Sequence, residues 1–289
     1  FTTYNMGTDH QVLDSPTFSA TDGNGGNFCT WNPLQSDVNL GGATKRATLS
    51  EGNLLATYDP GNYGQAIGTM GTKTGKFYTE YYINDAGYPS WAVGWTYSSR
   101  FEPYDGNSPA AGVGFLCTVG YFTGTDIYLS EFGNLVTNPT HPTYSSWTSS
   151  GTAPAQGDII MSAMDFDAGK AWFGKNGEWG NIGSGAGNPA TGANASLTWN
   201  AATFSSFHKY PFQLNYQGGI ALNAGQDPTS FGNITAGGNA DDNGFGNFKY
   251  DVPAGFLSLC SGNLSAAGAD PAEQKQPSKY FDAITYTGN

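Results

Sequence analysis

The stretch GDIIMSAMDFDAGKAWFGKNGEWG, residues 157–180, decides the fold that the sequence predicts. Apolar and smaller residues alternate from Ile159 to Met164, and a second run, KAWF, begins at Lys170. The segments DAGK and KNGE lie between and after these runs. Asn-Gly and Asp-x-Gly supply residues that tolerate positive φ, which tight antiparallel turns require. The stretch therefore predicts strand, turn, strand, turn, strand, which is an antiparallel meander.

The composition favours short strands joined by many turns. The chain of 289 residues contains 42 glycines, 18 Phe, 17 Tyr and 7 Trp, and only 12% of its residues are charged. Disordered chains combine low hydrophobicity with high charge, so this composition predicts a folded protein. No long apolar period of 3.6 residues is present, and we therefore expect almost no helix.

The charge balance excludes some classes of partner. Eleven basic and 23 acidic residues give 11 − 23 = −12, with a pI near 4.4. An acidic surface repels phosphate backbones, so we expect no nucleic-acid partner. The sequence has no apolar run of about 18 residues, so we also expect no membrane span.

Alternation with a period of two recurs upstream of the meander, in FYTEYY at 77–82 and in WAVGW at 91–95. Burial of each large apolar side chain is worth about 1.5–3 kcal/mol. We therefore expect Trp91 and Val93, together with the Trp172–Phe173 pair, to lie in the core rather than to form a platform for a ligand.

The segments outside these runs are less regular. Residues 100–157 predict a hairpin around TGTD at 123–126, followed by a long exposed loop rich in Pro, Ser and Thr. Residues 183–210 predict an excursion between strands, and residues 211–223 predict a further strand pair. Long loops on a rigid frame are where binding residues usually lie.

Two carboxylates in the meander leave two interpretations open. Asp165 and Asp167 alternate at one strand edge, as paired carboxylates of a glycosidase or a Ca²⁺ site could do. The alternative is turn chemistry, in which Asp167 accepts a backbone hydrogen bond in its turn and Asp165 faces solvent or a lysine. We favour turn chemistry, because the E-x-D-x-x-E strand of sandwich glucanases does not occur.

No other residues form a catalytic or metal-binding pattern. The cysteines are widely spaced with apolar or small neighbours, which predicts buried free thiols. The histidines are far apart in the sequence, and we expect them to lie in loops. Motifs for a nucleophilic serine, a zinc hydrolase or a phosphate loop do not occur. We therefore expect no cofactor, no metal and no enzymatic activity. The residues concerned are Cys29, Cys117, Cys260, His10, His141 and His208.

Aromatic and arginine side chains in or beside the irregular segments are the candidate binding residues. Tyr, Trp and Arg are enriched at binding hot spots, and aromatic rings stack on sugar faces. The alternative is that these side chains fix the loops to the frame. The candidates are Tyr97, Arg100, Tyr104, Tyr144 and Trp147.

Three groups of motifs resemble the SPRY domain, a β-sandwich recognition module. They are GK-x-Y-x-E leading to WAVG, then the meander with D-x-D-x-GK and KNG-x-W, and then GQ-x-P followed by P-x-G-F. They occur in that order across about residues 64–264, although an insertion at 232–246 departs from the family pattern. The resemblance implies an all-β, antiparallel β-sandwich with a SPRY/concanavalin-like jelly-roll layout. It also implies a strand at 248–250.

The ends of the chain resemble a narrower group. DSPT with NFCTWNPL, followed by TLSEGNL, is similar to the opening of SPRY-like modules in structural proteins of tailed phages, especially marine phages. The ending YFDAITYTGN is similar to a linker before a further module in such proteins. We expect N-terminal strands and loops packed on the sandwich at 1–63, the sandwich at 64–264, and a linker at 265–289 that makes residue 289 an interior break in a longer polypeptide.

This resemblance implies a non-enzymatic structural protein located in the virion. We expect an appendage role, in a tail fibre, spike or head fibre that presents loops for host attachment. The expected partners are other virion proteins, further copies of the chain in a homo-oligomer, and a glycan or protein of the host surface. The alternatives are a decoration or minor structural protein on the capsid and, third, a carbohydrate-acting enzyme of the same fold.

Overall fold

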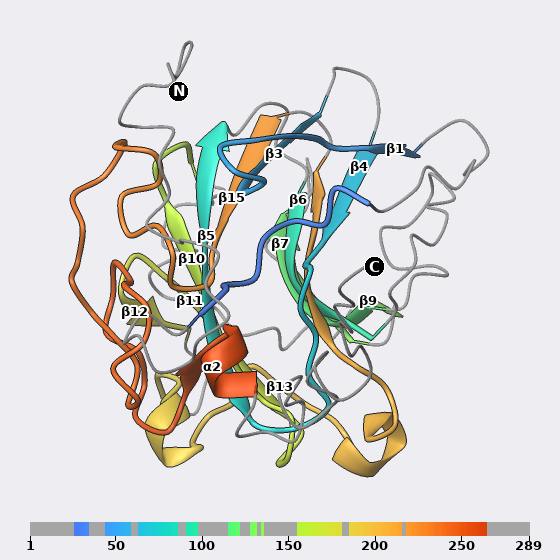
Figure 1. Cartoon of the computed structure of the whole chain (residues 1–289). Coiled ribbons are helices and arrows are strands. Elements are labelled where there is room, and N and C mark those ends of the chain that lie inside the picture. Colours follow the sequence, from blue (N-terminus) through green and yellow to red (C-terminus); the bar gives the residue numbers. More distant parts are fainter. Residues whose placement is uncertain are drawn as a thin grey trace, which may run out of the picture.

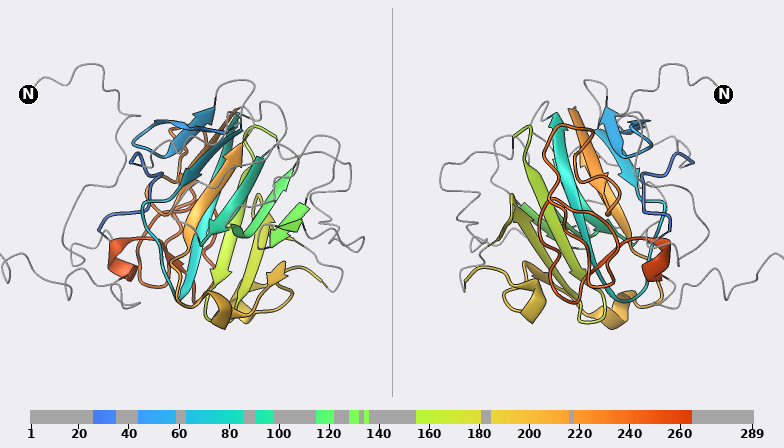
Figure 2. Two further views of the ribbon diagram at one scale, coloured as in Figure 1. Left: turned by 90° about the vertical axis from the view of Figure 1, so that its right-hand side faces the viewer. Right: turned by 60° about the vertical axis from the view of Figure 1, so that its left-hand side comes forward.

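The computed structural model describes residues 26–34, 44–58, 63–85, 91–97, 115–121, 128–131, 134–135, 155–180, 185–215 and 218–264. These residues form two stacked β-sheets, drawn in Figures 1 and 2. All strand pairs are antiparallel except β1 with β4 and β16 with β5. The predicted all-β, antiparallel sandwich is therefore confirmed. No helix in the described ranges is long and apolar enough to cross a membrane.

The first sheet has seven strands in the order β1-β4-β14-β6-β7-β8-β9. Their bounds are β1 Thr44–Arg46, β4 Tyr63–Ile67, β6 Trp91–Thr96, β7 Phe115–Tyr121, β8 Tyr128–Glu131, β9 Asn134–Leu135 and β14 Tyr210–Asn215. The antiparallel pairing of β7 with β8 confirms the predicted hairpin, whose turn lies outside the described residues.

The second sheet has nine strands, seven of them in the order β12-β11-β10-β5-β15-β3-β2, with β13 paired to β11 and β16 paired to β5. Their bounds are β2 Thr48–Ser50, β3 Leu55–Tyr58, β5 Lys76–Asp85, β10 Ile159–Asp165, β11 Lys170–Lys175, β12 Glu178–Trp179, β13 Leu197–Thr198, β15 Gly218–Asn223 and β16 Leu257–Ser258. The short helices are η2 Pro189–Thr191, η3 Ala201–Phe204 and α2 Ser261–Leu264. The division of the chain at residues 63 and 264 stays a prediction, although β2 and β3 belong to this sheet.

The predicted meander is confirmed as β10, β11 and β12. Ile160 pairs with Lys175 and Asp165 with Lys170, so the register runs without a break. The first turn needs glycine at 169, where φ is +64° and an added Cβ would lie 2.2 Å from the carbonyl oxygen of Trp199. The turn residues that predict the meander from the sequence therefore also form its turns in the structure.

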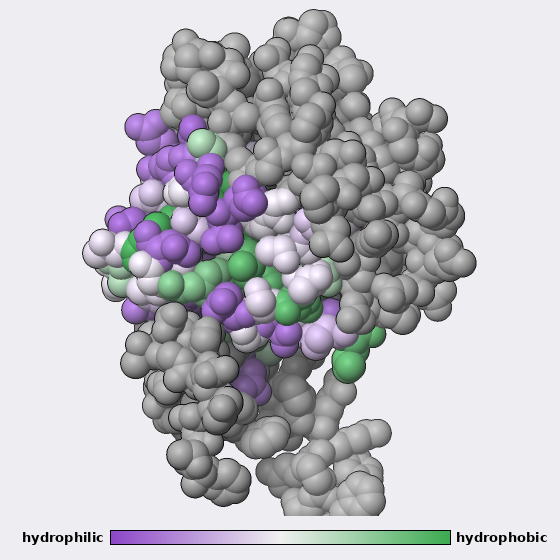
Figure 3. Space-filling view, turned by 90° about the horizontal axis from the view of Figure 1, so that it is seen from above, coloured by the Kyte–Doolittle hydropathy of each residue, from purple (hydrophilic) through white to green (hydrophobic). Residues whose placement is uncertain are grey.

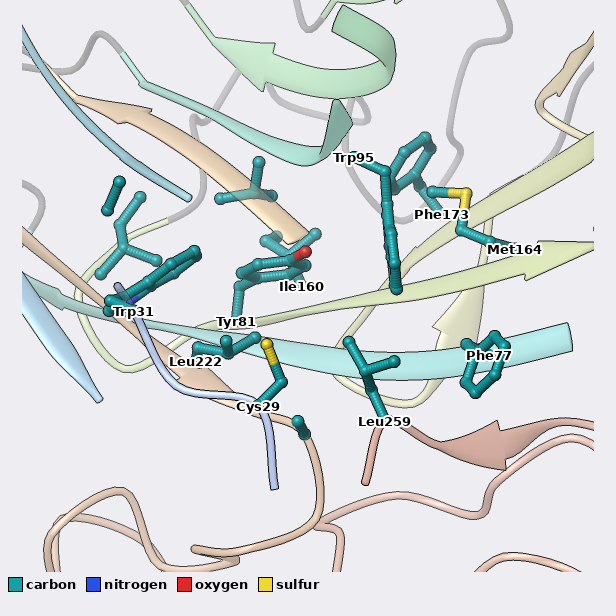
Figure 4. Packing of buried hydrophobic residues seen from close by; sticks show 14 of the residues in the cluster. Cys29, Trp31, Phe77, Tyr81, Trp95, Ile160, Met164, Phe173, Leu222 and Leu259 are labelled. Carbon is teal, nitrogen blue, oxygen red and sulfur yellow. The ribbon is translucent and has the colours of Figure 1, made fainter. Parts of the chain in front are cut away.

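The space between the sheets is filled by large apolar side chains (Figure 4). Trp91, Val93 and Phe173 are at most 1% exposed, which confirms them as core residues. Trp172 is equally buried, but on the outer face of the nine-stranded sheet. Cys29 and Cys260 are buried free thiols as predicted, and the side chain of Cys117 lies outside the described ones.

The central strands of the nine-stranded sheet are buried on both faces. Every residue from Phe77 to Tyr82 is buried, because the segment 224–258 covers the outer face of β5 and β10 (Figure 1). Phe248 and Phe256 pack on this face against Tyr78 and Trp172, at ring distances of 5.0 and 6.0 Å. Seen from above, hydrophilic and hydrophobic residues intermix on the described surface (Figure 3).

Two expectations about the later strands are wrong. The strands β14 and β15 form but do not pair with each other, because β14 joins β4 and β6 in one sheet while β15 joins β3 and β5 in the other. Residues 248–250 form no strand. Phe248 makes an isolated bridge with Asn239, and the next two amides donate to the carboxylate of Glu80 instead of to a neighbouring strand.

Candidate functional site

Three aromatic side chains form an exposed cluster where β6 ends. The ring of Tyr97 lies 5.1 Å from that of Phe204 and 5.6 Å from that of Phe207, and the two phenylalanine rings are 6.4 Å apart. Tyr97 and Phe204 are partly buried against the core between the sheets, whereas Phe207 is 46% exposed. We call these three residues the aromatic surface.

Local backbone structure fixes the aromatic surface in place. Asn200 caps η3 by accepting a hydrogen bond from the amide of Ala202, at 3.1 Å. The amide of Phe207 then donates to the carbonyl of Phe204 at 3.1 Å, which closes a second turn directly after η3. These turns lie at the lower end of the molecule in Figure 1. They hold both phenylalanines beside Tyr97, the first residue after β6.

Basic groups lie next to the aromatic surface. His208 and Lys73 are exposed, while Lys209 is 1% exposed and its Nζ donates to the carbonyl of Lys73 at 2.5 Å. Burial lowers the pKa of Lys209 to about 8, although Asp167 acts in the opposite direction. Burial also lowers the pKa of His208, and Lys73 and Lys209 add to this effect. His208 was correctly expected in a loop.

Only one predicted binding residue lies among the described ones. Tyr97 belongs to the aromatic surface, and Arg100 and Tyr104 follow it in the chain outside the described residues, as do Tyr144 and Trp147. Sequence reasoning placed the two phenylalanines of the surface in an excursion without assigning them to binding. The available signal was a pair of phenylalanines three residues apart in a polar segment that lacks strand alternation.

The two carboxylates of the meander make hydrogen bonds and an ion pair within the fold. Asp165 accepts a hydrogen bond from the amide of Ala168 at 2.8 Å and forms an ion pair with Lys76 at 3.2 Å. Asp167 accepts from the amide of Gly75 at 3.1 Å, outside its own turn. The turn bond is therefore made by Asp165, which corrects the role expected of Asp167. The reason is position, because Asp165 ends β10 and its carboxylate reaches the amide three residues ahead.

The buried carboxylate of Glu80 also accepts hydrogen bonds from within the two-sheet frame. Glu80 is 2% exposed and accepts hydrogen bonds from the amides of Lys249 and Tyr250, at 3.0 and 2.9 Å. The hydroxyl of Tyr78 and the side-chain amide of Asn223 donate to it as well, at 2.9 and 3.2 Å. This carboxylate therefore fastens the covering segment 224–258 to β5. Within the described ranges, no group of three or more His, Cys, Asp or Glu side chains is arranged to hold a metal ion.

The chain is similar to solved SPRY domains. For the crystal structure of the SPRY domain of human HERC1, the identity is 16%, the TM-score is 0.40, and the match covers 61% of this chain and 91% of that one. For the crystal structure of the TRIM65 PSpry domain, the identity is 14%, the TM-score is 0.40, and the match covers 67% and 89%. No protein-family model and no curated protein matches the chain.

Proposed function

We propose that this chain is a non-enzymatic structural protein of a tailed-phage virion. Its role is to present a binding surface to the host as part of a tail fibre, spike or head fibre. The observation that supports this role is the aromatic surface, in which a 46% exposed phenylalanine is held on a rigid two-sheet frame. The sequence motifs shared with phage structural proteins support the location in the virion.

The aromatic surface suits recognition of a glycan or an apolar protein side chain. Aromatic rings offer large contact areas with little conformational freedom to lose on binding. Tyr97 is packed against Phe204 and Phe207, so its ring is already fixed before a ligand arrives. The candidate binding residues Arg100 and Tyr104 follow Tyr97 in the sequence and lie outside the described residues. Other virion proteins and further copies of the chain are the remaining proposed partners.

The carboxylates of Asp165 and Glu80 support a binding role over a catalytic one. Asp165 forms an ion pair with Lys76, and Glu80 accepts four hydrogen bonds from within the frame. A general acid or base must reach a substrate proton, and these groups are already engaged. The purified chain would instead be a carbohydrate-acting enzyme if it released reducing sugar from host polysaccharide and if the variant Asp165→Asn lost this activity.

We expect Phe207→Ala to weaken binding of the fluorescently labelled chain to susceptible host cells by about tenfold or more. Loss of a hot-spot aromatic costs about 2 kcal/mol or more, and about 1.4 kcal/mol is tenfold in affinity. Thermal unfolding should stay close to that of the unmodified chain, because this side chain is exposed.

The matched control is Leu34→Ala, which removes an 88% exposed apolar side chain outside the aromatic surface. Host binding that is unchanged by Phe207→Ala, or lowered equally by Leu34→Ala, would count against the proposed site. If the unmodified chain does not bind host cells and instead binds phage heads at a fixed stoichiometry, the protein is a capsid decoration protein.

A further inference from the structure

Strand β14 turns polar side chains toward the space between the sheets. Gln213 lies opposite Val93 and Asn215 opposite Trp91 in the antiparallel pair with β6. Residues directly opposite each other project from the same face of a sheet. Because Val93 and Trp91 belong to the core between the sheets, Gln213 and Asn215 also point into it, and they are 0% and 2% exposed.

A tyrosine from the other sheet reaches the same place. Tyr58 ends β3, and its ring lies directly over Gly64 of β4, where an added Cβ would fall 1.4 Å from the ring. Gly64 lies opposite Asn215. Burial raises the pKa of Tyr58 well above its ordinary value, and a side-chain hydrogen bond with Gln213 acts against this rise. Tyr58, Trp91, Gln213 and Asn215 thus form one polar cluster inside the sandwich.

Polar atoms of this cluster are buried without a hydrogen-bond partner in the protein. They are Trp91 Nε1, Asn215 Oδ1 and the side-chain amide atom of Gln213 that Tyr58 does not engage. Leaving one buried polar atom unpaired costs about 1–3 kcal/mol. Native proteins satisfy nearly all such atoms, with protein groups or with ordered water. Several unpaired atoms from neighbouring positions therefore indicate a shared ligand.

We propose that Trp91, Gln213 and Asn215 form an internal binding site for water. These three side chains offer both N–H donors and carbonyl acceptors. A ligand that both donates and accepts hydrogen bonds matches this set, and an internal water makes about three such bonds. A cation does not match, because the N–H groups of Trp91 and Gln213 would repel it. The site lies between the sheets, where β3 ends and β6 begins.

The test is to measure cross-peaks between water and indole N–H protons in NOESY and ROESY spectra of the ¹⁵N-labelled chain. We expect the Trp91 indole proton to show a cross-peak with the sign of a long-lived bound water. The Trp172 indole is the internal control, because it is 1% exposed as a residue and its Nε1 donates to the carbonyl of Ala193 at 2.7 Å. It should show no such cross-peak.

The variant Tyr58→Phe excludes transfer through an exchanging hydroxyl proton. It removes the Tyr58 hydroxyl but keeps the ring over Gly64, and the cross-peak at Trp91 should persist in it. The proposal is overturned if the unmodified chain shows no cross-peak at Trp91, if Trp172 shows an equal one, or if the Trp91 signal disappears in Tyr58→Phe. Each of these outcomes means that the cluster holds no water of its own.

Discussion

Replacement of Glu80 by alanine should lower the free energy of unfolding by about 3–5 kcal/mol, because each hydrogen-bond donor left without its acceptor in the interior costs about 1–3 kcal/mol. The carboxylate of Glu80 is 2% exposed and accepts the amides of Lys249 and Tyr250. Residues 248–250 form no strand, so the variant leaves the amide donors of Lys249 and Tyr250 without acceptors. Equilibrium unfolding in urea measures the loss.

The control for this prediction is Glu178→Ala, which removes an exposed glutamate from β12 of the same sheet. It should change stability by no more than about 0.5 kcal/mol. Equal losses for the two variants would mean that Glu80 does not fasten the covering segment. Hydrogen exchange adds a local measurement, since the amides of Lys249 and Tyr250 should exchange much faster in Glu80→Ala than in Glu178→Ala.

The pH dependence of stability gives a second test of Glu80. Burial raises the pKa of Glu80, while the amides of Lys249 and Tyr250 act against this rise. The folded state therefore holds the proton to higher pH than the unfolded state does. The stabilisation from this group is complete below the unfolded pKa of about 4.3. It declines as the pH rises through the folded pKa. The difference in stability between the unmodified chain and Glu80→Gln should decline over the same range.

Replacement of Trp95 by alanine should cost about 3–5 kcal/mol, as expected for deletion of a fully buried aromatic side chain. Trp95 is 0% exposed, packs edge-on against Phe166 at 5.1 Å, and its Nε1 donates to the hydroxyl of Ser162 at 3.2 Å. This single side chain connects β6 of one sheet to β10 of the other (Figure 4). Its removal leaves a cavity and an unpaired hydroxyl between the sheets.

The matched control is Trp179→Ala, because Trp179 is only partly buried and packs at the edge of Tyr78 on the outer face. Its loss should cost clearly less than that of Trp95, as measured by the midpoint of denaturant unfolding. A larger effect at Trp179 would contradict the assignment of the main core to the space between the sheets.

The sequence predicts the parts of the fold that depend on near neighbours. The meander at 157–180 is confirmed, because its alternation and its turn residues act within a few positions. The separation of β14 from β15 was missed, because it depends on which sheet each strand joins. The role of Glu80 was missed for a similar reason, since its partners lie about 170 residues away in the chain.

The candidate site was predictable to a smaller extent. Tyr97 was identified as an aromatic residue beside an irregular segment, and the structure places it in the aromatic surface. Phe207 was not identified, because its exposure follows from the two turns after Asn200 rather than from any motif. The polar alternation of Gln213 and Asn215 is visible in the sequence, but only the pairing with β6 reveals that it faces inward.

An electron-microscopic map of the whole virion that is proposed to contain this chain tests the central claim most directly. The account predicts a two-sheet sandwich in a fibre or spike, with the end that carries Tyr97, Phe204 and Phe207 directed away from the particle. Particles that lack the chain would contradict the virion assignment. A sandwich seated on the head, with this aromatic surface turned against capsid subunits, would contradict the attachment role.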